Sequence, residues 1–345
     1  MKKYVLNEIP IKTTNSFKVN NIEIDLDIPD IDNFDDIILK NTNSLEVIIN
    51  KNCGPIKTGL GISFNKSYKI KLIVPENIEV KDTIKISYNF DNNRILVSDI
   101  EIIYEKNSSA NFILNFTSSN NYKYINSINQ KVVANNNSKG NITILNLLNN
   151  NSYNFLSITS SILEGASIVQ NFIDIGGNIK LANINTDLED ENAKYYLNNL
   201  YLGNNSDIID INYYIKNKYK NTTSNILVEG VLLGNAKKTY KGTIDFYKGA
   251  SNSIGIEKEN CVLLSKKAIS RSVPILLCSE DNVIGKHGVS TGNLDDRKIF
   301  YLMSRGLSEN DAKKLLINSN LNKIIDKIND SYTESIIYNY IDNKL

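Results

Sequence analysis

Apolar and polar residues alternate along much of this chain with a period of two. The alternation is clear at residues 22–28, 84–88, 100–105 and 209–215, where isoleucine, leucine or tyrosine occupies every second position. A period of two places successive side chains on opposite faces of a β-strand. These segments therefore predict strands with one apolar and one polar face.

Between residues 92 and 285 many short apolar segments are separated by turns rich in Asn, Gly, Ser and Asp. Glycines recur about every ten to thirty residues there, and the hairpin dipeptides Asn-Gly and Asp-Gly do not occur. A loose repeat without tight hairpin turns is typical of stacked coils. We therefore expect a mainly β fold built on a parallel β-helix. Periodicity alone leaves an antiparallel sandwich or jelly roll as the alternative.

After Gly292 the pattern becomes helical. Asp295 stands where a helix N-cap is expected, and Gly306 stands where a helix ends in a left-handed residue. Residues 308–311 and 331–334 have the Ser-x-x-acid form of an N-terminal capping box. The chain should therefore close with a small helical subdomain.

These patterns divide the chain into three parts. Residues 1–91 form a short β-rich N-terminal region that holds four of the five prolines. Residues 92–292 form the β-helix core, and residues 293–345 form the C-terminal helical subdomain.

Composition narrows the class of protein. In 345 residues, 41% are apolar, which suffices for a large core, and 39 basic against 38 acidic residues give a net charge of +1. Without a basic field, we expect no nucleic acid partner. The N-terminus lacks the apolar run of roughly 7 to 15 residues that a signal peptide needs. No segment reaches the roughly 18 apolar residues of a membrane span. We expect a cytoplasmic protein that binds no membrane.

Familiar catalytic motifs are absent. The sequence has no phosphate-binding loop and no Gly-x-Ser-x-Gly elbow, so nucleotide binding through such a loop is not expected and hydrolysis has little support. Its three cysteines, Cys53, Cys261 and Cys278, form no C-x-x-C pair, which argues against a disulfide framework and a structural zinc site.

The most specific pattern lies between residues 259 and 317. It combines Asn260 before Leu263-Leu264-Ser265, then Pro274, then the run His287 to Gly292, then Phe300 to Ser308. This pattern resembles the SufB/SufD family of iron–sulfur cluster assembly proteins, with matched spacing from the proline to the histidine and onward. The resemblance implies a right-handed parallel β-helix followed by C-terminal helices. It fades before residue 90, so we expect a short form without the larger helical N-terminal domain common in the family.

The resemblance also implies a function. Members of the family are scaffolds that pair through their β-helices and bind the ABC-type ATPase SufC through their C-terminal helices, so we expect no enzymatic activity and no catalytic residues. Glu259 lies where the SufB branch has a sulfur-accepting cysteine, and Gly288 lies where that branch has a glutamate. The chain therefore resembles the SufD branch. It departs from that branch at Gly285, often a cysteine, and at Leu277, often a glutamate.

Three residues are candidates for an iron or cluster site. His287, the only histidine, sits in what we interpret as a short polar turn. Its chemistry alone favours a structural role, and the resemblance favours an iron ligand. Cys261 is either a cluster ligand or a buried inert thiol, and Cys278 is expected to be buried. Glu259 is either a cluster carboxylate or a solvated acid at a strand end.

The helix after Gly292 supplies candidates for contact with the ATPase. Such residues can also pack the helical subdomain on itself, and we expect both roles, with Arg305 pointing outward. The candidates are Phe300, Tyr301, Leu302, Arg305 and Gly306.

The resemblance finally implies partners and a cofactor. We expect a transient iron–sulfur cluster shared with a partner chain, a SufC-type ABC ATPase, and a SufB-type subunit or a second copy of this chain. A flavin is compatible with the family but not indicated by the sequence. The alternatives are a SufB-like homodimer that binds a cluster with SufC only, and a carbohydrate-active β-helix with an outward acidic cleft.

Overall fold

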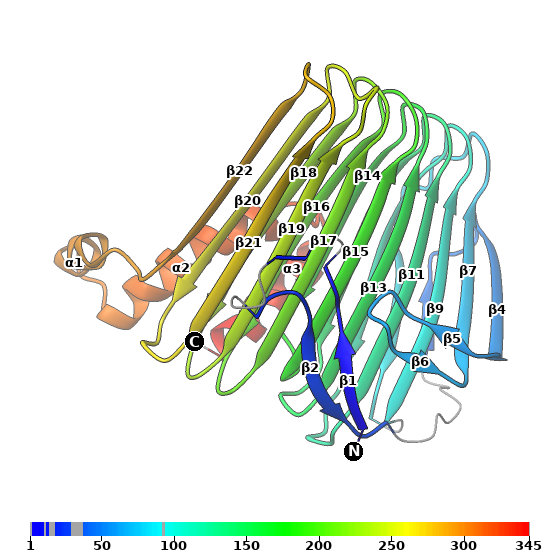
Figure 1. The fold of residues 1–345 in the computed structure, drawn as a ribbon. Coiled ribbons are helices and arrows are strands. Elements are labelled where there is room, and N and C mark those ends of the chain that lie inside the picture. The colour runs from blue at the N-terminus through cyan, green and yellow to red at the C-terminus, as the bar shows by residue number, and fades with distance from the viewer. Residues whose placement is uncertain (1, 10–11, 14–17, 29–36, 92–93, 345) are drawn as a thin grey trace.

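The chain folds into a parallel β-helix followed by three helices (Figure 1). This computed structural model describes residues 2–9, 12–13, 18–28, 37–91 and 94–344. The predicted fold class is confirmed, and the sandwich alternative is excluded because the long sheets are built from parallel neighbours.

Two nine-stranded sheets face each other across the core. We call them the helix-side sheet and the hairpin-side sheet, after the elements that cover their outer faces. The helix-side sheet contains β3 (Ile37–Lys40), β8 (Ile84–Asn89), β10 (Ser109–Thr117), β12 (Lys139–Leu147), β14 (Ser167–Asp174), β16 (Lys194–Gly203), β18 (Thr223–Leu232), β20 (Ile254–Leu263) and β22 (Ile284–Gly292). The hairpin-side sheet contains β4 (Glu46–Cys53), β7 (Ser67–Val74), β9 (Ile95–Tyr104), β11 (Ile125–Ala134), β13 (Tyr153–Ile162), β15 (Ile179–Leu188), β17 (Ile208–Asn217), β19 (Lys237–Phe246) and β21 (Ile269–Cys278).

Successive coils stack in register. From β7 and β8 onward every neighbouring pair in the two sheets is parallel, whereas β3 and β4 pair antiparallel at the N-terminal end. The stack therefore begins before residue 92, with β7 and β8, and ends at β21 and β22. The division of the chain at residue 92 stays a prediction.

Alternate positions of each strand point into the core. Inward side chains are mostly isoleucine, leucine, phenylalanine and tyrosine, and they form one continuous cluster from Tyr68 to Cys261. One corner of the coils is lined by left-handed asparagines, which tolerate positive φ better than most residues. These are Asn77, Asn107, Asn137, Asn192, Asn221 and Asn252.

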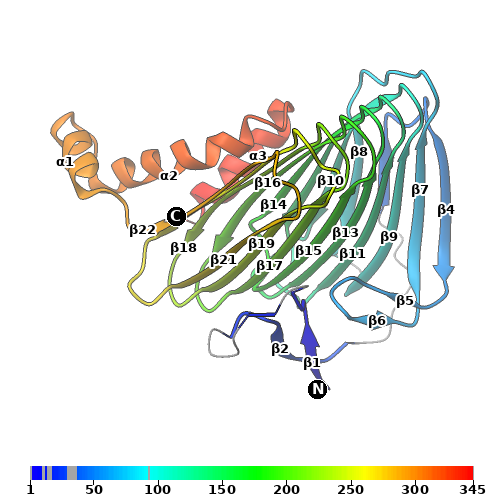
Figure 2. The ribbon, with the colours of Figure 1, turned by 45° about the horizontal axis from the view of Figure 1, so that its top comes forward.

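Three helices follow the last strand: α1 (Asp296–Ser304), α2 (Glu309–Ile325) and α3 (Ser331–Asp342). Helices α2 and α3 lie along the outer face of the helix-side sheet (Figure 2), where Ile317, Leu321 and Ile324 join an apolar cluster with residues of that sheet. This cluster fixes their position, because burial of apolar surface is the main favourable contribution to packing.

The predicted helix ends are mostly confirmed. Asp295 and Ser308 cap α1 and α2 through their side-chain oxygens, and Gly306 adopts a φ of 98° after α1. The third capping box was predicted to begin at Ser331, which is one residue too late. Asp330 caps α3, because its carboxylate accepts hydrogen bonds from the backbone N–H and the hydroxyl of Thr333.

An N-terminal hairpin covers the hairpin-side sheet on the opposite side of the molecule (Figure 2). It consists of β1 (Lys2–Leu6) and β2 (Ile22–Leu26), and a second small hairpin of β5 (Ile56–Lys57) and β6 (Ser63–Phe64) lies beside it. Asn7 anchors the first hairpin, because its Nδ2 donates to Asp210 Oδ1 at 2.6 Å and its carbonyl accepts from Lys241 Nζ at 3.0 Å.

A search of the described helices finds none that is both long and apolar enough to cross a bilayer.

Candidate functional site

The candidate site lies at the C-terminal end of the β-helix. Strands β21 and β22 are the last strands of their sheets, and in the described structure each has a paired inner edge and an unpaired outer edge (Figure 1). We call these two strands the terminal rung. The last coil that lies fully beneath it contains β19 and β20.

His287 lies within β22 and not in a turn, which corrects the interpretation from the sequence. The run from His287 to Gly292 is polar and rich in glycine, and in the middle of a chain that composition is typical of a turn. A terminal strand has no further coil above it, so it can carry polar residues and still pair along its backbone. Here that pairing is with β20, where Glu257 is the partner of His287.

The structure brings the three site candidates onto one face. Glu259 and Cys261 are inward residues of β20, and both are buried. His287 lies on the same face of β22, because its partner Glu257 is separated from them by even steps. The histidine itself is exposed to solvent. The site therefore consists of an exposed imidazole over a buried polar layer.

Glu259 is fully buried, which contradicts the expectation of a solvated acid. Its carboxylate forms an ion pair with Lys238 of β19, and both side chains have no exposed surface. Lys238 also donates to Ser272 Oγ of β21 at 2.8 Å. A charge this deep requires a partner, and Lys238 supplies it from across the core. The sequence could have indicated this pair, because Lys238 occupies a position of β19 whose alternation with its neighbours points into the core.

Tyr201 completes the environment of Glu259. Its hydroxyl lies 3.2 Å from Glu259 Oε1, and burial raises the pKa of this phenol well above its usual value, so the hydroxyl stays protonated and donates. The ring reaches across β18 at Gly230, where an added Cβ would lie 2.0 Å from Tyr201 Cζ. Gly230 is therefore needed for the close approach of this ring.

The two cysteines of this region behave differently. Cys261 is buried beneath the terminal rung, as expected, and burial raises the pKa of its thiol despite the nearby Lys238 ammonium. Cys278 is exposed at the end of β21, which contradicts the expectation that its apolar neighbours would bury it. The reason is its position on the last strand, where no further coil covers the inward face.

The sequence reading missed Glu257. This side chain is 1% exposed, and burial, reinforced by the charge of Glu259, raises its pKa to about 7 although the hydroxyl of Tyr240 lowers it. No salt bridge to it is found among the described residues. Both Glu257 and Tyr240 fill the space that Gly242 leaves open. The only sequence signal was the spacing of two between Glu257 and Glu259.

The polar layer does not form a finished metal site. Among the described residues, no three His, Cys, Asp or Glu side chains are grouped closely enough to hold a metal ion. His287 is the one site candidate that solvent reaches, while Glu259 is held by Lys238 and Cys261 is covered. Of the three site candidates, one is therefore exposed to solvent and two are buried.

The candidate docking helix α1 lies at one end of the molecule, beyond the terminal rung (Figure 1). Phe300 is 74% exposed and Tyr301 is 56% exposed, and Arg305 is exposed with its guanidinium 5.3 Å from the Tyr301 ring. Leu302 is half-buried, while the buried residue of the helix is Ile299. The two aromatic residues are therefore not used for packing the subdomain on itself.

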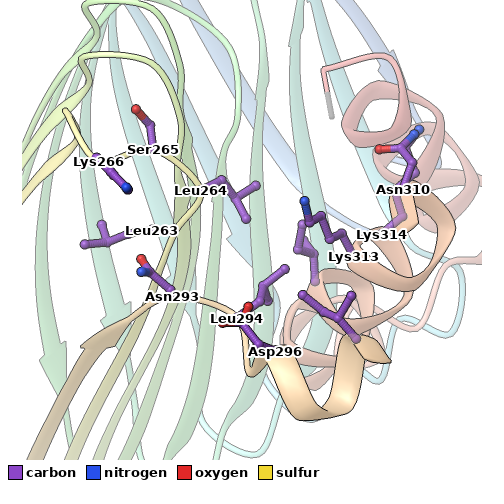
Figure 3. A pocket seen from close by; sticks show the side chains of 12 residues that line it. Leu263, Leu264, Ser265, Lys266, Asn293, Leu294, Asp296, Asn310, Lys313 and Lys314 are labelled. Carbon is purple, nitrogen blue, oxygen red and sulfur yellow. The ribbon is translucent and has the colours of Figure 1, made fainter. Parts of the chain in front are cut away.

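A cavity of about 280 Å³ lies where the helices meet the β-helix. Residues 263–266, at the end of β20 and in the turn toward β21, line one side of it, and Lys313 and Lys314 of α2 line the other (Figure 3). Leu294 and Asp296 close it at the start of α1.

Comparison with known proteins identifies the family. Residues 87–320 match the family model described as SUF system FeS cluster assembly, SufBD core domain. The SufD protein of Bacillus subtilis strain 168 is 24% identical over 267 residues, which is 74% of this chain and 60% of that protein. The SufD protein of Escherichia coli K12 is 26% identical over 166 residues, which is 48% of this chain and 39% of that protein.

A SufBD family protein of Mycobacterium leprae is 26% identical over 164 residues, which is 45% of this chain and 42% of that protein. The matched part of this chain thus spans between 39% and 60% of the length of these relatives. The family model covers well over half of the chain, from β8 into α2. The chain therefore belongs to the SufBD family of the SUF iron–sulfur cluster assembly system.

Proposed function

We propose that this chain is a SufD-like, non-enzymatic scaffold subunit. It pairs through the terminal rung with a SufB-type subunit or with a second copy of itself, and the pair shelters a nascent iron–sulfur cluster. It docks a SufC-type ABC ATPase through α1. The observation that carries this proposal is the terminal rung, where an exposed histidine and two unpaired strand edges lie over buried Glu259 and Cys261.

Pairing through the terminal rung follows from its open edges. The outer backbone N–H and C=O groups of β21 and β22 have no strand beside them in the described structure. A partner strand laid along such an edge satisfies those groups and continues the sheet. Val289 and Ile284, both exposed on β22, would gain apolar contact from the same partner.

The cluster is cargo in this proposal, and His287 is its first ligand. A neutral imidazole binds iron well, and this one is accessible. Since the described residues form no complete site, the remaining ligands come from the partner chain. Glu259 and Cys261 can join only when the terminal rung shifts, because one is ion-paired and the other is covered.

Docking of the ATPase is proposed at the exposed aromatic face of α1. Aromatic and arginine side chains contribute most of the binding energy in many interfaces, and Phe300, Tyr301 and Arg305 present such a group to solvent.

The carbohydrate-active alternative loses support, because Glu257 and Glu259 face the core and form no outward acidic cleft.

A binding experiment with the SufC-type ATPase from the same organism tests the docking. The intact chain should capture the ATPase, and a Phe300→Ala/Arg305→Ala double variant should lose most of that binding, by about a hundredfold if both are interface anchors. Tyr332→Ala is the matched control, because Tyr332 is an exposed aromatic residue of α3. A folded wild-type chain that fails to bind the ATPase contradicts the proposal.

The cluster site has its own test. Anaerobic reconstitution of the chain with a SufB-type partner should give a visible chromophore that His287→Ala weakens. A chromophore that forms with the chain alone, in a dimer, would favour the SufB-like homodimer. A pair that forms the same chromophore with and without the imidazole excludes His287 as a ligand.

A further inference from the structure

Glu229 joins helix α2 to the strand that carries the site. It is an outward residue of β18, yet it is only 1% exposed because α2 covers it. Its Oε1 accepts from Lys323 Nζ of α2 at 3.0 Å and from Asn260 Nδ2 of β20 at 2.8 Å. One buried carboxylate oxygen thus holds a helix and a neighbouring strand together.

Asn260 connects the Glu229 contact to the candidate site. Asn260 lies between Glu259 and Cys261 on β20, and successive residues of a strand point to opposite faces. Its side chain therefore points toward the helices, while its two neighbours point into the site. A shift of the β20 backbone at Asn260 moves both site residues, since they share its peptide bonds.

Other polar anchors of the C-terminal helical subdomain reach β16 or the segment that follows β12. Lys327 Nζ donates to Asn198 Oδ1 of β16 at 2.9 Å, and the hydroxyl of Tyr340 donates to the carbonyl of Leu148 at 2.9 Å. Lys344 contacts Asn150. Within the described residues, Glu229 is the point where a hydrogen-bonded contact from α2 also reaches β20.

The two sides of the Glu229 contact differ in their access to water. Lys323 is 47% exposed, so its ammonium can leave Glu229 and be solvated by water. The carboxylate cannot follow, because it is buried, and it would then remain as a charge without a cation. A buried charge that loses its partner is strongly unfavourable. Departure of Lys323 therefore favours a rearrangement of β18 and β20 around Asn260.

We propose that Glu229 is a positioning residue that couples α2 to the site on β20. A partner that pulls on α1 displaces α2, Lys323 leaves Glu229, and β20 shifts at Asn260, which loosens the cover over Cys261. This inference rests on the proposed docking of the ATPase at α1, and it adds the route by which docking reaches the site.

The first test uses the chain alone. In a Cys53→Ser/Cys278→Ser background, the rate at which a maleimide labels Cys261 reports local opening of the terminal rung. Lys323→Met should raise that rate roughly three- to tenfold, because it leaves the Glu229 charge uncompensated. Glu229→Gln should stay near the wild-type rate, because a neutral amide oxygen still accepts from Asn260.

Lys327→Met is the matched control, since it removes a lysine in the turn just after α2 that contacts β16 and not β20. Circular dichroism and the urea midpoint verify that each variant is folded. Equal acceleration by Lys323→Met and Lys327→Met, or no acceleration by Lys323→Met, overturns the proposal.

The second test adds the SufC-type ATPase with a non-hydrolysable ATP analogue. Binding should raise the labelling rate of Cys261 in the Lys327→Met chain and in its parent by at least about threefold. The Glu229→Gln chain should bind the ATPase equally well without that rise. An equal rise in Glu229→Gln overturns the coupling role of Glu229. Failure of every chain to bind the ATPase overturns the docking proposal instead, and the labelling result for the chain alone still decides whether Glu229 holds β20.

Discussion

Loss of Lys238 should destabilise the protein more than loss of any single solvent-exposed lysine. In Lys238→Met the aliphatic part of the side chain is kept, and the ammonium that faces Glu259 is removed. Both members of this pair are fully buried, so the remaining carboxylate would face the core without a cation. Breaking a buried pair in this way typically costs about 3–5 kcal/mol of unfolding free energy.

The magnitude follows from the surroundings of Glu259. In the variant its oxygens keep only the Tyr201 hydroxyl as a donor among the side-chain bonds described for them, and one neutral donor cannot offset a buried charge. Glu259→Gln should cost less, about 1–2 kcal/mol, because Lys238 retains Ser272 Oγ and the carbonyl of Arg271 as acceptors. The double variant should therefore be more stable than Lys238→Met alone by about 1–3 kcal/mol.

Urea unfolding followed by circular dichroism gives these free energies, with the m-value as a check that the cooperative unit is unchanged. Lys131→Met is the control, because Lys131 pairs with Glu101 at the surface with 57% of its side chain exposed and should cost at most about 1 kcal/mol. The reasoning is refuted if Lys238→Met costs no more than the control, or if the double variant is as unstable as the sum of the single variants.

Three further outcomes are expected. Burial raises the pKa of Asp174 to about 6, and a raised acid pKa in the folded state means that stability falls as pH rises through that value. Asp174→Asn should therefore gain about 2–3 kcal/mol relative to wild type between about pH 4 and pH 8 in urea titrations, and a constant difference would contradict this. Gly230→Ala should lower the free energy of unfolding by about 1–3 kcal/mol because its Cβ meets the Tyr201 ring, and adding Tyr201→Leu should restore part of it. Asn7→Ala should cost about 1–3 kcal/mol and speed proteolysis of the N-terminal hairpin, because Asp210 loses a buried donor; an unchanged cleavage rate would show that Asn7 is not the anchor.

Local patterns in the sequence predicted the local structure well. The alternating residues 209–215 lie in a strand. Asp295 and Ser308 cap the N-termini of α1 and α2, and Gly306 follows the end of α1 with a positive φ. Each of these signals acts within a few residues, so a single sequence is enough to read it. The family pattern singled out His287, Glu259 and Cys261, which the structure places on β20 and β22, and their role as a site stays a prediction.

The environment of each site residue could not be read in the same way. Whether Glu259 is solvated depends on Lys238, which comes from the opposite sheet, and that proximity is fixed only when the coil closes. His287 was placed in a turn instead of a strand and Cys278 was expected to be buried, because neither pattern shows that these residues lie in the last coil of the stack. The contact of Asn7 with Asp210 joins residues 203 positions apart, so no local pattern in the sequence predicts it.

The open end of the β-helix also bears on how the chain persists in a cell. A closed barrel satisfies its own edges, whereas this stack ends in two strands whose outer hydrogen-bonding groups pair with no strand of the described residues. A subunit without its partner is then the form most exposed to aggregation and to proteases, and binding of the partner stabilises it by mass action. If the terminal rung pairs as proposed, the same edge would thereby keep the number of free subunits matched to the number of partners.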